Sequence, residues 1–366
     1  MSHETPALTE ADRLMTVCNS CRYCEGLCAV FPAMEMKRAF TDGDLNHLAN
    51  LCHSCGACYH DCQFSPPHEF DVNVPQVLAQ VRNESYAYYA WPAAARPLFV
   101  RHSMALTIGL TLTFALFMIG FVAANDPGAL WTAHLDDGRF YALMPHNSMA
   151  ALFGGAFLWM LIAIFMGARA FWRDAGAPDL SARDHVLATQ NAAQLTYLDG
   201  GGQGCFNEDD QPTDRRKLWH HFTFYGFLLC LASTTLATLY HYLLGLEAPY
   251  VWYDIPPLLG IVGGIGLVIG PLGLIHAKMT RLEDLRTPGF KSMEYGFIVI
   301  LLLTGASGLA LRILGETPLL GLMLALHLGA VLTFFLTMPY GKFVHGLYRY
   351  LALLRYARDK RQIGLV

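Results

Sequence analysis

Long apolar runs follow one another through most of the chain after residue 95. A helix that spans a bilayer needs about 20 apolar residues, because a rise of 1.5 Å per residue must cover roughly 30 Å of hydrocarbon. Six stretches meet this requirement: 103–124, 148–171, 219–245, 256–278, 293–313 and 318–345. They are too long and continuous for the strands of a membrane barrel. The pattern therefore predicts an all-α membrane protein with a six-helix transmembrane bundle.

The first 95 residues differ from the rest, because polar residues interrupt every apolar run. We expect an α-helical, ferredoxin-like domain at 1–95, a transmembrane bundle at 96–350 with a polar loop at 174–217, and a basic tail at 351–366. Overall, 54% of the residues are hydrophobic, 15% are charged and the mean hydropathy is +0.33. These values are too apolar for an ordinary soluble domain.

Basic residues gather at alternate ends of the predicted spans. Arg96, Arg173, Lys278 and Arg349 share one side, whereas the opposite loops at 125–147 and 246–255 are nearly without them. Short loops rich in Lys and Arg stay in the cytoplasm. We therefore expect an inner-membrane protein with both termini in the cytoplasm. The net charge of −4, without a basic stripe, argues against a nucleic-acid partner.

Two cysteine runs with one spacing, Cys-x2-Cys-x2-Cys-x3-Cys, lie in the polar domain, and the second begins 34 residues after the first, at 52 against 18. This is the ligand spacing of two-cluster ferredoxins, in which the fourth cysteine of each run binds the other [4Fe–4S] cluster. The expected ligands of one cluster are Cys18, Cys21, Cys24 and Cys62. Those of the other are Cys52, Cys55, Cys58 and Cys28.

Zinc and disulfide bonds are the alternatives for these cysteines. Zinc sites often use two Cys-x2-Cys pairs with a longer gap between them, so three consecutive short gaps suit a compact cluster better. Disulfides suit exported chains, and we expect no signal peptide, because the first long apolar run starts near Ser103. Cys205 and Cys230 lie outside both runs and are expected to be ordinary thiols.

Histidines within the spans are candidate haem ligands. Ionisable residues in a membrane are costly and usually functional, and imidazoles from two helices commonly hold a b-type haem. The candidates are His220, His221, His241, His327 and His345. The last two lie 18 residues apart, which is five whole turns of one helix. We expect one or two haems, with His241 opposite His327 and an inner histidine opposite His345.

Two adjacent histidines, His220 and His221, are alternatives for the inner haem ligand opposite His345. On an ideal helix His220 is about 60° out of phase with His241, and His221 about 160° out of phase, so geometry favours His220. His276 is a reserve ligand, although it is more naturally an interfacial histidine, as is His102. The alternative for every candidate is an interfacial histidine that hydrogen-bonds to backbone or lipid headgroups.

The loop at 174–217 contains a glycine cluster between Asp199 and Cys205. Such clusters can cradle a phosphate, but the strand and helix of a dinucleotide-binding fingerprint are missing. We expect a turn that lies against the polar domain.

The cysteine runs combined with the histidine-bearing segments resemble the tricarballylate, or citrate, utilization protein B family. The segments are 220–230, 238–241 and 338–346, and the resemblance covers nearly the whole chain. It implies a membrane iron–sulfur protein whose transmembrane part is similar to the cytochrome b subunit of respiratory nitrate reductase.

The resemblance also implies an electron-transfer role beside a partner. In this family a separate FAD-dependent dehydrogenase oxidises tricarballylate to cis-aconitate, and the membrane protein reoxidises the flavin and passes electrons to the quinone pool. The chain would then be an electron-transfer subunit of an oxidoreductase, because it has no flavin-binding fingerprint of its own.

Three other functions are open. One is a membrane subunit of a heterodisulfide-reductase-like or other quinone-linked redox complex, which a neighbouring flavoprotein gene would disfavour. Another is an iron–sulfur redox sensor, which predicts no haem and which a kinase or DNA-binding segment would support. A transporter is disfavoured, because acidic and basic residues within the spans are scarce.

Overall fold

The chain is almost entirely helical in the computed structural model, which describes residues 3–135, 139–176, 178–209, 211–287 and 289–364. The N-terminal domain, residues 3–95, contains five helices: α1 (Pro6–Cys21), α2 (Val30–Glu35), α3 (Asp42–Leu51), α4 (Ala57–His60) and α5 (Val74–Tyr88), followed by the short η1 (Ala93–Ala95). The described residues include no strand, only an isolated bridge between Cys205 and Thr213. The predicted all-α class is confirmed.

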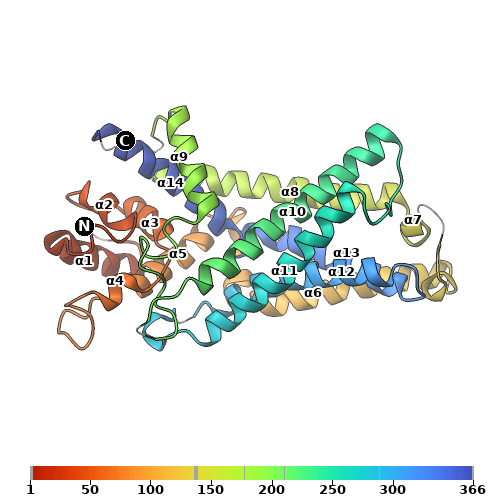
Figure 1. Cartoon of the computed structure of the whole chain (residues 1–366), viewed down its shortest axis with the longest axis horizontal. Helices are drawn as coiled ribbons and strands as arrows, with labels where there is room; N and C mark the ends of the chain where they lie inside the picture. The colour runs from red at the N-terminus through yellow and green to blue at the C-terminus, as the bar shows by residue number, and fades with distance from the viewer. Residues whose placement is uncertain (1–2, 136–138, 177, 210, 288, 365–366) are drawn as a thin grey trace.

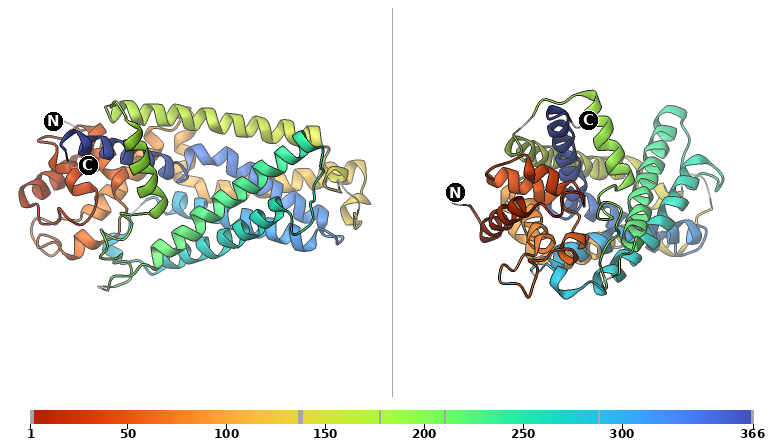
Figure 2. Two further views of the ribbon diagram at one scale, coloured as in Figure 1. Left: turned by 45° about the horizontal axis from the view of Figure 1, so that its top comes forward. Right: turned by 60° about the vertical axis from the view of Figure 1, so that its left-hand side comes forward.

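Six helices in the described ranges are long and apolar enough to cross a membrane. They are α6 (Arg96–Asn125), α8 (His146–Asp174), α10 (Arg215–Leu244), α11 (Ile255–Met279), α12 (Lys291–Leu314) and α13 (Leu320–Thr337) with η4 (Met338–Tyr340). The chain is therefore a multi-pass membrane protein. Figure 1 shows these helices extending from one side of the N-terminal domain, with both termini at the domain end of the bundle. Figure 2 shows the same arrangement from two other directions.

Shorter elements connect the spans. At the end of the bundle far from the N-terminal domain lie η2 (Ala129–Trp131) and α7 (Arg139–Leu143). At the domain end lie α9 (Ala182–Gln194) and η3 (Glu283–Leu285). Large apolar side chains such as Phe117, Phe165 and Leu243 are exposed along the spans, as expected for a surface that faces lipid.

Helices α10 and α11 pack closely through small residues. A Cβ atom on Gly226 would lie 2.9 Å from the carbonyl oxygen of Gly263, and one on Gly263 would lie 2.8 Å from that of Gly226. Because lipid tails are as apolar as side chains, membrane helices gain most by such close backbone contact. These glycines bring the two helix backbones together where any side chain would hold them apart.

The sixth predicted span is shorter than expected. The apolar pattern predicts His327 and His345 on one continuous helix, but α13 ends at Thr337 and α14 (Val344–Gln362) begins separately. Pro339 lies in the 3-10 turn between them and lacks the N–H that a continuing α-helix requires. The prediction that both histidines share one helix is therefore wrong, and His345 begins the following helix.

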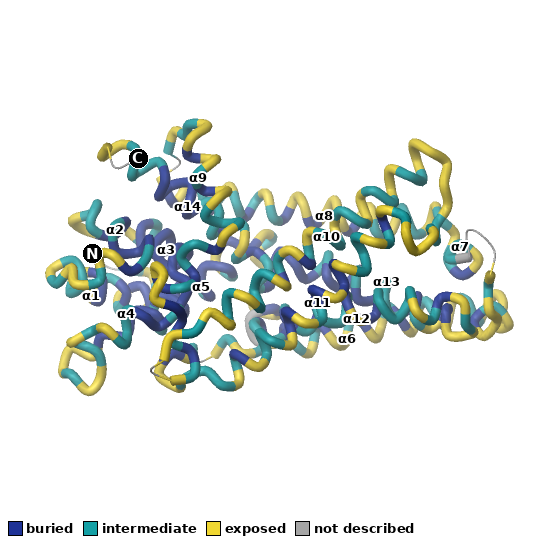
Figure 3. Tube along the Cα trace, viewed as in Figure 1, coloured by how far each residue is buried: buried dark blue, intermediate teal, exposed yellow. Residues whose placement is uncertain are grey.

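Helix α14 joins the bundle to the N-terminal domain. The predicted boundary of a basic tail at 351 falls within this helix, and residues 352–357 of α14 are buried. Arg355 donates a 2.6 Å hydrogen bond to Asp44 of α3, and the ring of Tyr348 stacks on Phe171 of α8 with centroids 5.1 Å apart. Figure 3 shows buried residues concentrated where α14 meets the N-terminal domain. Residues 365–366 lie outside the described ones.

Candidate electron-transfer site

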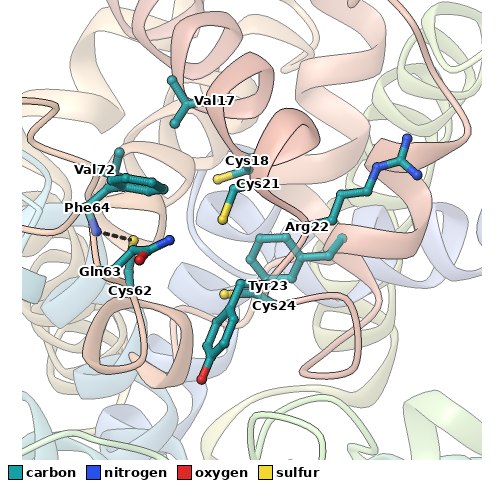
Figure 4. Close-up of a pocket in the computed structure, with 11 residues that line it drawn as sticks. Val17, Cys18, Cys21, Arg22, Tyr23, Cys24, Cys62, Gln63, Phe64 and Val72 are labelled. Atoms are coloured by element: carbon teal, nitrogen blue, oxygen red, sulfur yellow. Dashed lines mark hydrogen bonds between the residues drawn. The ribbon is translucent and has the colours of Figure 1, made fainter.

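Four cysteines from three segments line one cavity of the N-terminal domain. Cys18 and Cys21 lie three residues apart in the last turns of α1, so they share a helix face. Arg22 then ends the helix in the left-handed conformation, with φ of 58°, and turns the chain toward Cys24. Cys62, just beyond α4, completes the set. Figure 4 shows the four sulfur atoms facing a common space, which we call the first cysteine cavity.

The other four cysteines line a second cavity. Cys52 caps the end of α3, and Cys58 lies on α4. Cys55 lies between Ser54 and Gly56, both of which have positive φ angles and turn the chain sharply. Cys28 comes from the first run, just before α2. We call this the second cysteine cavity. The structure thus groups the eight cysteines in the crossed sets that the spacing predicts.

Burial makes these thiols poor acids without a metal. It raises the pKa of Cys18 to about 12, together with the neighbouring Cys24 and Cys62, and it raises the pKa of Cys55 to about 12 as well. Thiolates clustered in this way would need a positive partner, which the iron atoms of a cluster would supply. Within the described ranges no three His, Cys, Asp or Glu side chains converge on a single ion site.

The glycine-containing loop covers the second cysteine cavity. Tyr197 and Gly200 line it, and a Cβ on Gly200 would lie 3.4 Å from the sulfur of Cys55. Gly201 has φ of +76°, and a Cβ there would lie 2.1 Å from the carbonyl oxygen of Leu27. The loop lies against the N-terminal domain, as predicted. Cys205 is buried beneath it and donates to the carbonyl of Leu198 at 2.8 Å.

His53 lines the second cysteine cavity, its carbonyl accepts a hydrogen bond from Arg216 of α10, and no sequence pattern indicated it. It follows Cys52, lines the cavity and is 7% exposed. Burial lowers the pKa of His53 well below its usual value, as do the neighbouring Arg349, Arg216 and His220. Its place next to a cysteine ligand was the only signal in the sequence.

Arginines hold the segment around His53 in place. Arg349 donates to the carbonyl of Asn50 at 3.1 Å and to that of Cys52 at 2.7 Å. Arg216 donates to the carbonyls of His53 and Ser54, both at 2.9 Å. Because α10 carries Arg216 and α14 carries Arg349, both helices fix the cysteine-bearing segment directly.

The inner candidate haem ligands lie together. The rings of His220 on α10 and His345 on α14 have centroids 6.0 Å apart and planes at 81°. Two imidazoles that bind one iron from opposite sides have ring centres about 6 Å apart, since each metal–nitrogen bond is about 2 Å. His345 Nδ1 is 2.5 Å from the carbonyl of Lys342, which leaves Nε2 available, and His220 Nδ1 is buried without a partner. The distance between the two rings therefore matches that expected of two imidazoles on one iron. His221 lies beside Tyr225, and its Nε2 is also buried without a partner.

The outer candidates have other neighbours. The ring of His241 stacks on that of His146 of α8, with centroids 4.0 Å apart, and its Nδ1 is buried without a partner. His327 Nδ1 is 3.1 Å from the hydroxyl of Ser307 on α12. Among the described residues no ring contact joins His241 to His327. Their pairing stays a prediction. His146 is a further candidate that the apolar pattern did not indicate, because the predicted span began at residue 148 whereas α8 begins at His146.

Comparison with known proteins decides the family. The family model "Citrate utilization protein B" matches residues 99–364, and the model of its Fer4-like domain matches residues 11–88. The chain belongs to the citrate utilization protein B family. Its sequence is 46% identical over 354 residues to citrate utilization protein B of Escherichia coli, covering 96% of this chain and 93% of that protein. No solved structure matches.

Membership in this family confirms the predicted resemblance to it. A Fer4-like domain on a membrane bundle fits an iron–sulfur electron-transfer protein. The similarity of the bundle to the cytochrome b subunit of nitrate reductase stays a prediction.

Proposed function

We propose that this protein is a membrane electron-transfer subunit that reoxidises the reduced FAD of a partner dehydrogenase of the tricarballylate or citrate type and reduces quinone. The observation that carries the proposal is that Arg216 of α10 and Arg349 of α14 bind the segment bearing Cys52 and His53, on the same helices that carry His220 and His345. When bound, two [4Fe–4S] clusters and b-type haem would supply one-electron carriers. Substrate chemistry then belongs to the partner.

The two cysteine cavities differ in how accessible they are to a partner protein. The first is lined by Arg22 and Tyr23, and Tyr23 is 73% exposed, so a soluble flavoprotein can approach it. The second is covered by Tyr197 and Gly200, and Arg216 of α10 donates to the carbonyl of His53, which lines it. We infer that electrons enter through the first cavity and leave through the second. The basic residues at this end of the bundle favour its location in the cytoplasm.

One measurement separates this function from a redox sensor without haem. We expect the purified protein to contain about eight acid-labile sulfides per chain and to show a b-type band in its dithionite-reduced minus oxidised spectrum. Pyridine haemochrome then gives the haem per chain. If the protein contains acid-labile sulfide but shows no b-type band, the haem assignment is rejected and the cluster assignment is retained. That result would favour the redox sensor.

A second measurement tests the role of His53. His53→Leu removes the imidazole but keeps a buried side chain of similar size. We expect full sulfide and haem content, with slower haem reduction after a reduced dehydrogenase is mixed with the protein. Thr9→Leu, at an exposed position of α1 away from the cysteine runs, is the control in the same domain and should leave the rate unchanged. An unchanged rate in His53→Leu would contradict the proposed route.

A further inference from the structure

A basic cavity lies where the N-terminal domain meets the ends of α10, α11 and α12. Its volume is about 160 Å³, well above the roughly 30 Å³ that one water occupies in the liquid. Seven of the fourteen described residues that line it are cationic: Arg82, Arg216, Lys278, Arg281, Arg286, Lys291 and Lys342. Glu294 is the one carboxylate among the described lining residues.

That carboxylate is already shared by two lysines. Lys278 Nζ lies 2.5 Å from one oxygen of Glu294, and Lys342 binds the other oxygen. Burial lowers the pKa of Lys342 to about 7, although Glu294 acts in the opposite direction. One carboxylate therefore does not balance the charge around the cavity.

The arginines face neutral acceptors. Arg281 donates to the carbonyl of Ser54 at 2.8 Å and to its hydroxyl at 3.0 Å, and Arg216 donates to the same carbonyl. Burial and the neighbouring Arg216 lower the pKa of Arg281 to about 10. Backbone carbonyls orient these guanidinium groups but leave their charge uncompensated.

A helix begins at the same cavity. Lys291 is the first residue of α12, and no side chain caps this helix at Phe290. The free N–H groups of a long helix favour an anion at its N-terminus. Arg286 and Lys291 are exposed and stand at the mouth of the cavity, whereas Arg82 and Arg281 lie deeper.

We propose that this cavity binds the phosphate group of an acidic phospholipid. It lies at the ends of the spanning helices, at the level where headgroups lie, and basic pockets between such helices suit anionic headgroups. Met279, which lines the cavity, is 66% exposed, and Leu272 on α11 is 51% exposed, so acyl chains can follow the helix. The proposal does not depend on the electron-transfer role.

The test measures phosphatidylglycerol binding to the purified full chain by native mass spectrometry. Arg286→Gln with Lys291→Gln removes two charges from the mouth and should weaken binding about tenfold or more. Arg38→Gln with Arg183→Gln removes two exposed charges elsewhere and should leave binding unchanged. If the double variant does not fold, binding is measured with Lys291→Gln alone. Phosphatidylcholine, which has no net charge, is the matched lipid.

Equal phosphatidylglycerol binding by the wild type and both mouth variants would overturn the proposal. So would equal affinity for phosphatidylcholine. A second experiment uses inorganic phosphate in place of the lipid. If it raises the melting temperature of the wild type in phosphatidylcholine while phosphatidylglycerol does not bind, the source is free phosphate and the lipid assignment is overturned.

Discussion

His345 stands beside His220 although Pro339 separates it from the span that carries His327. The short connection after α13 therefore sets the inner pair, and His345 begins the helix that docks on the N-terminal domain. The same helix supplies Arg349, which holds the segment that bears Cys52. One element thus positions both a candidate haem ligand and a candidate cluster ligand.

Removal of either inner histidine should remove one haem. We expect His220→Ala and His345→Ala each to lose the same haem by pyridine haemochrome assay. His221→Ala is the matched control, because its ring lies beside Tyr225. Loss of haem from His221→Ala, with retention in His220→Ala, would reverse the assignment.

The outer ligands can be separated in the same way. His327→Ala should remove only one haem. If either His146→Ala or His327→Ala causes the same loss of haem as His241→Ala, that histidine is the partner of His241. If neither His241→Ala nor His327→Ala changes the haem content, the outer site does not exist.

The crossed cysteine sets predict pairs of matching variants. Cys62→Ser should perturb the same cluster as Cys18→Ser, and Cys28→Ser the same cluster as Cys55→Ser, because each pair lines one cavity. Electron paramagnetic resonance of the reduced protein distinguishes the two clusters. Cys230→Ser is the control and should leave both signals intact. Cys62→Ser resembling Cys55→Ser would show that the runs do not cross.

The glycine-containing loop should need Gly201 in order to cover the second cysteine cavity. A Cβ there meets the carbonyl of Leu27, whereas Gly202, also at positive φ, has open space around its Cβ position. Both alanine variants carry backbone strain of about 1–2 kcal/mol, but only Gly201→Ala adds a clash. We expect Gly201→Ala to lose iron to a chelator several-fold faster than Gly202→Ala. Equal rates would mean that the loop does not protect the cavity.

The Asp44–Arg355 pair should stabilise the docking of α14. Burial disfavours the charged form of Asp44, but its bonds from Arg355 and Thr41 prevail and lower its pKa to about 2. Asp44→Asn should therefore lower the free energy of unfolding at pH 7 by about 2 kcal/mol. The stabilisation is present above about pH 4 and is lost as the pH falls toward 2, so wild type and variant should converge there.

Thermal unfolding in detergent at several pH values measures this difference. Asp179→Asn, at an exposed position, is the control and should match the wild type throughout. A difference between wild type and Asp44→Asn that does not change with pH would show that the carboxylate charge is not responsible.

Local sequence patterns predicted the features that are local in structure. The six spans follow from uninterrupted apolar runs, and the cysteine spacing placed all eight thiols in two groups. Pro339 was the visible signal for the end of α13, but the apolar run continues across it and concealed the break. His53 and His146 acquire their neighbours only through contacts between distant helices, which periodicity along one helix does not contain.

The most direct test of the electron-transfer role uses the partner reaction under anaerobic conditions. A reduced FAD-dependent dehydrogenase is mixed with the purified protein, a quinone is then added, and visible absorption is recorded throughout. We expect the dehydrogenase to reduce the cluster and haem bands and the quinone to reoxidise them. Bands that dithionite reduces but that neither the dehydrogenase nor the quinone changes would contradict the proposed function.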